Sequence, residues 1–127
     1  MRNDGLDKKI IGAAIEVHRA LGPGLLESAY EQCLCHELEL KGLLFDSQRE
    51  LPVEYKGKNL DCGYRLDIVV DDSIILELKV VETIEPIHKA QLLTYLRLTN
   101  LSLGFLLNFN VPLMRDGIVR MVNGFQE

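Results

Sequence analysis

Residues 63–81 read Gly-Tyr-Arg-Leu-Asp-Ile-Val-Val-Asp-Asp-Ser-Ile-Ile-Leu-Glu-Leu-Lys-Val-Val. Two runs rich in Leu, Ile and Val flank the turn-forming sequence Asp71-Asp72-Ser73, a pattern that predicts a β-hairpin. Side chains alternate between the two faces of a strand. Glu77 and Lys79 therefore share one face, and the aliphatic residues between and beside them take the other.

The length of the turn decides whether Asp67 joins Glu77 and Lys79. A two-residue turn would place Asp67 on the opposite face, whereas a three-residue loop brings it to the same face. We expect the odd loop, or a bulge. With residues 72–74 in the loop, Asp67 pairs with Lys79.

Two carboxylates converging with an ammonium group indicate a site for a hard divalent cation, Mg2+ or Mn2+, which prefers oxygen ligands. In such a site Lys79 can orient or deprotonate a water molecule, and the chemistry is phosphodiester hydrolysis. The alternative is an exposed strand whose charged residues alternate with core aliphatics. Taken alone, the spacing of Asp67, Glu77 and Lys79 is more often of that kind.

Composition and charge limit the classes of protein. We expect residues 1–127 to form one domain with a hydrophobic core, since 47% of them are hydrophobic. The sequence has no apolar run of about 18 residues, and its amino terminus lacks the apolar core of a secretory signal, so the expected location is cytoplasmic. The three cysteines are expected to be reduced, and their spacing does not suit zinc.

The net charge of −5 argues against a long nucleic-acid footprint, because nonspecific affinity comes from neutralising many phosphates. Catalytic carboxylates contribute to that negative count and are neutralised when a metal binds. We expect contact with DNA or RNA to be short, or to be supplied by a homodimer or a larger assembly.

The hydrophobic periodicity predicts the remaining elements. We expect helices over residues 6–21, 25–41 and 85–99, with Thr83 as the cap of the third. Strands are expected over residues 50–55, from about residue 60 through the hairpin, and over residues 103–109 and 117–123. The order indicates a mixed α/β sheet flanked by helices.

The third predicted helix carries a polar stripe of His88, Gln91 and Tyr95. If this helix packs beside Glu77, Gln91 is placed to bond the lysine or a metal-bound water, and His88 and Tyr95 are candidate substrate contacts. The stripe is equally typical of a half-exposed surface, on which His88 makes a structural hydrogen bond.

Glu27 begins the second predicted helix, where an acid is favoured electrostatically whatever its function. Tyr30 lies on the same face, one turn later. The two residues enter the site together, or else Glu27 stabilises the helix start and Tyr30 belongs to the core.

Five blocks in order resemble the GxxExxY protein family. Gly24-Leu-Leu-Glu-Ser-Ala-Tyr30 matches its name-giving pattern, and the later blocks follow over nearly the whole chain: Leu66-Asp67, Glu77-Leu-Lys79, residues 88–95 and residues 107–112. This family is assigned by similarity to the PD-(D/E)XK nuclease superfamily. The resemblance implies a restriction-endonuclease-like core in the order α-β-β-β-α-β.

The resemblance also implies a role for individual residues. It implies that Asp67 and Glu77 are metal ligands, joined by Glu27 as a third acid and by the backbone carbonyl of Leu78. It implies further that Lys79 is the catalytic lysine and that Gln91 is the glutamine of the following helix. Leu66 replaces the proline that gives the superfamily's motif its first letter. Because that proline ligates no metal, the replacement changes the motif's name more than its chemistry. The function implied is a Mg2+- or Mn2+-dependent nuclease. The alternatives are a non-catalytic interaction or assembly module and a hydrolase of small phosphate esters.

Overall fold

The computed structural model describes residues 5–61 and 63–124. Its helices are α1 (Leu6–Leu21), α2 (Glu27–Leu40), α3 (Pro86–Thr99) and the short 3-10 helix η1 (Met114–Gly117). Its strands are β1 (Phe45–Glu50), β2 (Val53–Tyr55), β3 (Lys58–Leu60), β4 (Arg65–Val70), β5 (Ile74–Lys79), β6 (Leu103–Asn108) and β7 (Ile118–Val122).

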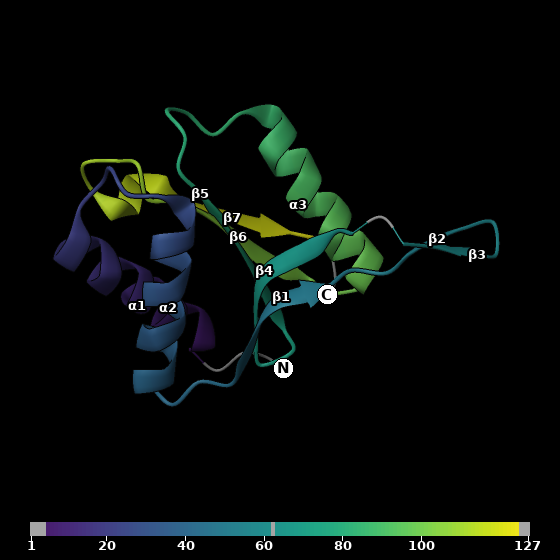
Figure 1. The fold of residues 1–127 in the computed structure, drawn as a ribbon, viewed down its shortest axis with the longest axis horizontal. Helices are drawn as coiled ribbons and strands as arrows, with labels where there is room; N and C mark the ends of the chain where they lie inside the picture. The colour runs from purple at the N-terminus through teal and green to yellow at the C-terminus, as the bar shows by residue number, and fades with distance from the viewer. Residues whose placement is uncertain (1–4, 62, 125–127) are drawn as a thin grey trace.

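The main sheet has five strands in the order β1-β4-β5-β6-β7 and lies between two helical layers. Figure 1 shows α1 and α2 together on one side of the sheet and α3 on the other. Strands β5 and β6 are parallel and joined through α3, whereas the other neighbouring pairs are antiparallel. This confirms the expected mixed α/β architecture with a restriction-endonuclease-like element order.

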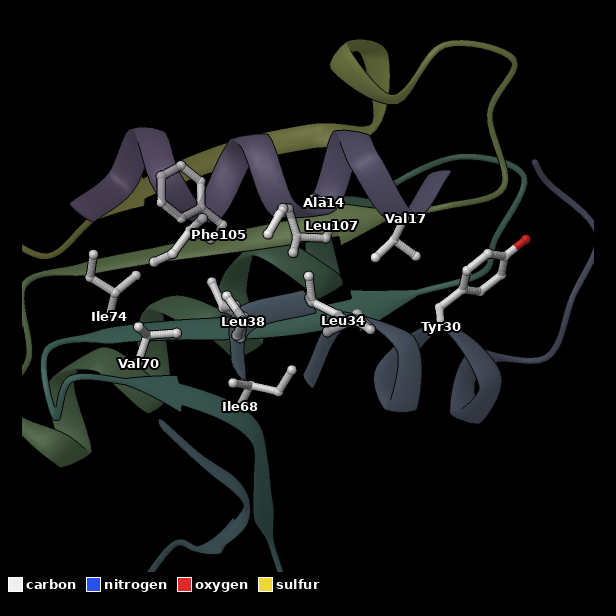
Figure 2. Packing of buried hydrophobic residues seen from close by; sticks show 14 of the residues in the cluster. Ala14, Val17, Tyr30, Leu34, Leu38, Ile68, Val70, Ile74, Phe105 and Leu107 are labelled. Carbon is white, nitrogen blue, oxygen red and sulfur yellow. The ribbon is translucent and has the colours of Figure 1, made fainter. Parts of the chain in front are cut away.

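Each face of the sheet buries its own hydrophobic cluster. On one face, Ile68, Val70 and Leu76 pack with Leu34 and other residues of α1 and α2 (Figure 2). On the other face, Val69 and Ile75 join the residues of α3. Full burial of such a side chain stabilises the fold by about 1.5–3 kcal/mol. In β5, Ile74, Leu76 and Leu78 belong to the cluster under α1 and α2 while Ile75 belongs to the cluster under α3, an alternation that puts Glu77 and Lys79 on the same side as Ile75.

The central hairpin has the predicted three-residue loop, but in a different register. Val70 pairs with Ile74, so the loop consists of residues 71–73 and not 72–74. Asp71 and Asp72 adopt left-handed backbone conformations, with φ of 52° and 53°, which aspartate tolerates better than β-branched residues do. Ile74 is thereby left to begin β5. The predicted pairing of Asp67 with Lys79 is wrong, because the same register aligns Asp67 with Glu77.

Three local predictions also require correction. The strand predicted over residues 50–55 is divided at Leu51-Pro52, and the main-sheet strand β1 was not predicted. The predicted hairpin turn at residues 56–59 does occur, but it joins β2 to β3 in a separate two-stranded sheet, which extends away from the rest of the molecule (Figure 1). Thr83 does not cap α3. Glu85 is the N-cap residue, and its N–H donates to His88 Nδ1 at 2.9 Å.

Candidate active site

Asp67 and Glu77 lie side by side where the β4–β5 ladder ends. The last ladder pair is Ile68 with Leu76. Beyond it, the Asp67 N–H donates to Glu77 Oε2 at 3.0 Å, and the Leu78 N–H donates to Asp67 Oδ2 at 2.9 Å. The two carboxylates thus accept backbone hydrogen bonds from opposite strands, which holds both groups at one point of the sheet.

The acidic pair, Asp67 and Glu77, is strongly perturbed. Burial, followed by the negative charge of Asp67, raises the pKa of Glu77 to about 8, although the Asp67 N–H and Lys79 act in the opposite direction. Burial also raises the pKa of Asp67, against the hydrogen bond from Leu78 and the charge of Lys79. Two adjacent buried carboxylates disfavour the doubly ionised state unless positive charge accompanies them.

Lys79 supplies positive charge from the same strand face as Glu77. It is half-buried, and its charge opposes part of the upward shift in the pKa of Glu27, Asp67 and Glu77. In the part of the chain that the structure describes, Lys79 forms no direct ion pair within 4.0 Å. Its ammonium group is therefore near the acids without being committed to one of them.

Glu27 reaches the edge of this cluster from the first turn of α2. Its side chain is exposed, and partial desolvation together with the charge of Asp67 raises its pKa. The structure thus brings Glu27 within electrostatic range of the acidic pair and Lys79. Among the described residues, however, no three His, Cys, Asp or Glu side chains form a group that could hold a metal ion.

The polar stripe of α3 is divided between the site and the helix end. Tyr95 is 7% exposed, and burial followed by the charge of Glu77 raises the pKa of its hydroxyl. Gln91 is half-buried and makes no side-chain hydrogen bond to any residue within the described ranges. His88 is occupied through Nδ1 at the start of α3. Of these three described residues, Tyr95 is the one with an electrostatic interaction with the acids.

Tyr30 belongs to the core, as one of its two expected interpretations had it. The side chain has no exposed surface, and its ring stacks on Phe109 with centroids 4.6 Å apart. Its hydroxyl donates to the Gly22 carbonyl at 2.5 Å and accepts from the Leu25 N–H at 3.1 Å. Tyr30 is therefore not placed to contact a substrate. It fixes the loop that leads into Glu27.

Two residues near Asp67 were not identified from the sequence. Gln48 of β1 donates through Nε2 to Glu31 Oε2 at 2.8 Å, and the charge of Asp67 contributes to the raised pKa of Glu31. Glu31 follows Glu27 by four residues, so the helical period alone was sufficient to place both on one face. Gln48 gave no such signal, because its strand was not predicted.

Asn108, at the end of β6, was also missed. It is 2% exposed, and its side-chain amide donates to the Val81 carbonyl at 2.9 Å and accepts from the Val81 N–H at 3.1 Å. The register pairs Asn108 with Lys79. The Asn108 side chain therefore secures the chain just after the lysine, and a buried Asn following a hydrophobic strand was the available signal.

The family model of the PD-(D/E)XK nuclease superfamily matches residues 4–121 of the chain. The protein belongs to this superfamily. Comparison with curated proteins and with solved structures gives no match. Membership gives the acidic pair and Lys79 a context, because proteins of this superfamily are generally hydrolytic nucleases, which typically use divalent metals.

The residues of this superfamily member fit a hard divalent cation. Glu77 is 5% exposed, and the hydrogen bond that it accepts from the described part of the chain goes to Oε2. No donor from the described residues reaches its other oxygen, which is therefore available to a proton, a water molecule or a cation. Oxygen donors of this kind are what Mg2+ and Mn2+ prefer.

None of the helices in the described ranges has the length and apolarity needed to cross a membrane.

Proposed function

We propose that the protein is a Mg2+- or Mn2+-dependent phosphodiester hydrolase of the nuclease type. The observation that carries this proposal is the buried acidic pair of Asp67 and Glu77, in which one carboxylate oxygen lacks a donor, beside the uncommitted ammonium of Lys79. Superfamily membership supports the reaction class.

The proposed ligands of the cation are the carboxylates of Asp67 and Glu77 and the carbonyl of Leu78, with Glu27 as the additional acid from α2. When bound, the cation neutralises phosphate charge and favours ionisation of water. A cation at this position also removes the repulsion between the two carboxylates, which the protein alone only partly offsets through Lys79.

In the proposed reaction, Lys79 orients the attacking water and receives or relays its proton. The water oxygen attacks phosphorus, the P–O ester bond breaks, and the products are a phosphate monoester and an alcohol. Gln91 holds the lysine or the water, while Tyr95 and His88 contact the substrate. Positioning and electrostatic stabilisation then provide most of the rate enhancement.

The proposed substrate is DNA or RNA, bound over a short footprint. The net charge of −5 disfavours neutralisation of many phosphates along a strand. A small phosphate ester uses the same residues and needs no basic surface, so it is included among the substrates to be assayed.

The test is cleavage of labelled single- and double-stranded DNA and RNA, and of a small phosphodiester, with Mn2+. We expect Lys79→Ala to lower the rate by about 10²- to 10⁴-fold, the usual contribution of general acid–base catalysis. Lys9→Ala is the matched control, because Lys9 is an exposed lysine of α1. Equal cleavage by wild type and Lys79→Ala would remove the role assigned to Lys79.

A non-catalytic module that retains the scaffold is the second candidate. It is favoured by the exposure of Glu27 and by the absence, within the described residues, of a three-residue metal group. Calorimetric titration with Mn2+ separates the two functions. An enzyme binds Mn2+ and loses that binding in Asp67→Asn but not in the surface control Asp116→Asn, whereas an inactive module shows no such difference.

A further inference from the structure

Gln48 occupies the position on β1 opposite Asp67. The β1–β4 register fixes this alignment, since Ser47 pairs with Ile68 one residue earlier. The ladder skips Gln48 itself, but side chains opposite one another on neighbouring antiparallel strands are close enough to interact. Gln48 is therefore the residue of β1 nearest, along the strand, to the acidic pair.

The amide of Gln48 is placed to serve two carboxylates from different elements. Its Nε2 donates to Glu31 Oε2 of α2 at 2.8 Å, and the strand register puts the same residue opposite Asp67. A primary amide carries two N–H donors and can serve both acceptors. The Asp67 carboxylate accepts from the Leu78 N–H of β5, and Gln48 lies opposite it on β1 with one amide N–H to spare.

The backbone of Gln48 shows that this contact is not incidental. Its φ is 55°, in the left-handed region that glycine or asparagine occupies more readily than glutamine does. A non-glycine residue in this conformation costs about 1 kcal/mol and persists only where its surroundings determine it. The hydrogen bond from the Gln48 side chain to Glu31 is an interaction that a glycine could not replace.

We propose that Gln48 is a positioning residue for the acidic pair: its amide, fixed by Glu31, holds the Asp67 carboxylate in the orientation that binds the divalent cation. This inference rests on the proposed function, since it assigns Gln48 to the same metal site. It adds a residue of β1 and a second acid of α2 that act through Asp67 and touch neither substrate nor reacting atoms.

The experiment compares Mn2+ affinity, by calorimetry, with the free energy of unfolding, by urea titration, in Gln48→Gly and Gln48→Asn. Gly relieves the backbone and removes the amide, while Asn suits the backbone but is one methylene too short. Lys56→Gly is the matched control, because Lys56 has a similar φ of 52° in the distant β2–β3 turn. We expect both Gln48 variants to fold and to lose tenfold or more in Mn2+ affinity, as is typical when a metal ligand loses its hydrogen-bonding partner. Lys56→Gly should keep its affinity.

Unchanged Mn2+ affinity in both Gln48 variants, with wild type binding normally, would overturn the positioning role while leaving the proposed function intact. If wild type itself binds no Mn2+, the proposed function fails, and a double-mutant cycle in unfolding free energy still tests the contact. Strong non-additivity between Gln48→Asn and Glu31→Ala supports the amide bridge, and additivity overturns it.

Discussion

At the scale of single residues, the acidic pair makes stability depend on pH. The pKa of Glu77 rises from its ordinary 4.5 to about 8 in the fold, so the metal-free native state binds a proton more tightly than the unfolded chain does. The stabilisation that the protonated Glu77 gives the fold is complete below pH 4.5 and is lost as pH rises through about 8. A proton relieves the repulsion within the pair, as would the cation of the proposed function.

We expect Glu77→Gln to abolish this loss, because glutamine keeps the shape and carries no charge. At pH 8.5 with a chelator, the variant should be more stable than wild type by about 4 kcal/mol, whereas at pH 5 the two should be similar. Urea unfolding across this pH range measures the difference. Glu16→Gln, on the exposed face of α1, serves as control, and an equal slope in wild type and Glu77→Gln would contradict the assignment.

At the scale of elements, the entry of the chain into α2 depends on Tyr30. Removing its hydroxyl in Tyr30→Phe retains the ring stack on Phe109 but leaves the Gly22 carbonyl and the Leu25 N–H without this partner. We expect a loss of about 1–2 kcal/mol in unfolding free energy. Because the same loop delivers Glu27, Mn2+ affinity should also fall.

Urea unfolding and calorimetry measure both effects of Tyr30→Phe. Tyr55→Phe is the matched control, since Tyr55 is 62% exposed on β2. A destabilised variant with normal Mn2+ affinity would show that the loop supports the fold without positioning Glu27.

The elements also show what could be predicted from the sequence. The range of α1 was predicted correctly, because its apolar residues recur with the helical period over four turns. The β1 strand was missed because it lies at the sheet edge, where only Phe45 and Arg49 are partly buried, so no period-two alternation of apolar residues is visible. Gln48 was lost with it, since its role depends on that edge pairing.

The proximity of Asp67 and Glu77 could be predicted from the sequence for a different reason. The predicted three-residue loop was correct, and it brings Asp67 opposite Glu77, even though the register was two residues off. The position of the loop along the chain depends on the left-handed conformations of Asp71 and Asp72. The amino-acid composition does not specify these conformations. That Asp67 and Glu77 come together could be predicted from the odd number of residues in the loop, whereas their exact pairing depends on the backbone conformation of the loop.

At the scale of the whole molecule, the acidic surface predicts weak salt dependence of nucleic-acid binding. With about two or three phosphates neutralised, the slope of log affinity against log salt should be about −2 to −3. Fluorescence anisotropy of labelled DNA with Lys79→Ala and Mn2+ from 50 to 200 mM salt measures it. Slopes of about −6 or steeper would indicate a long basic footprint and contradict the short one proposed.

The separate β2–β3 sheet has a practical consequence. It shares no strand with the main sheet, and its Lys56-Gly57 turn lies in an exposed, extended arm (Figure 1). An inserted fluorophore or affinity tag at this turn would disturb neither hydrophobic cluster, because the residues of both clusters lie outside the turn. The arm therefore offers an attachment point for single-molecule reporters that leaves the acidic pair untouched.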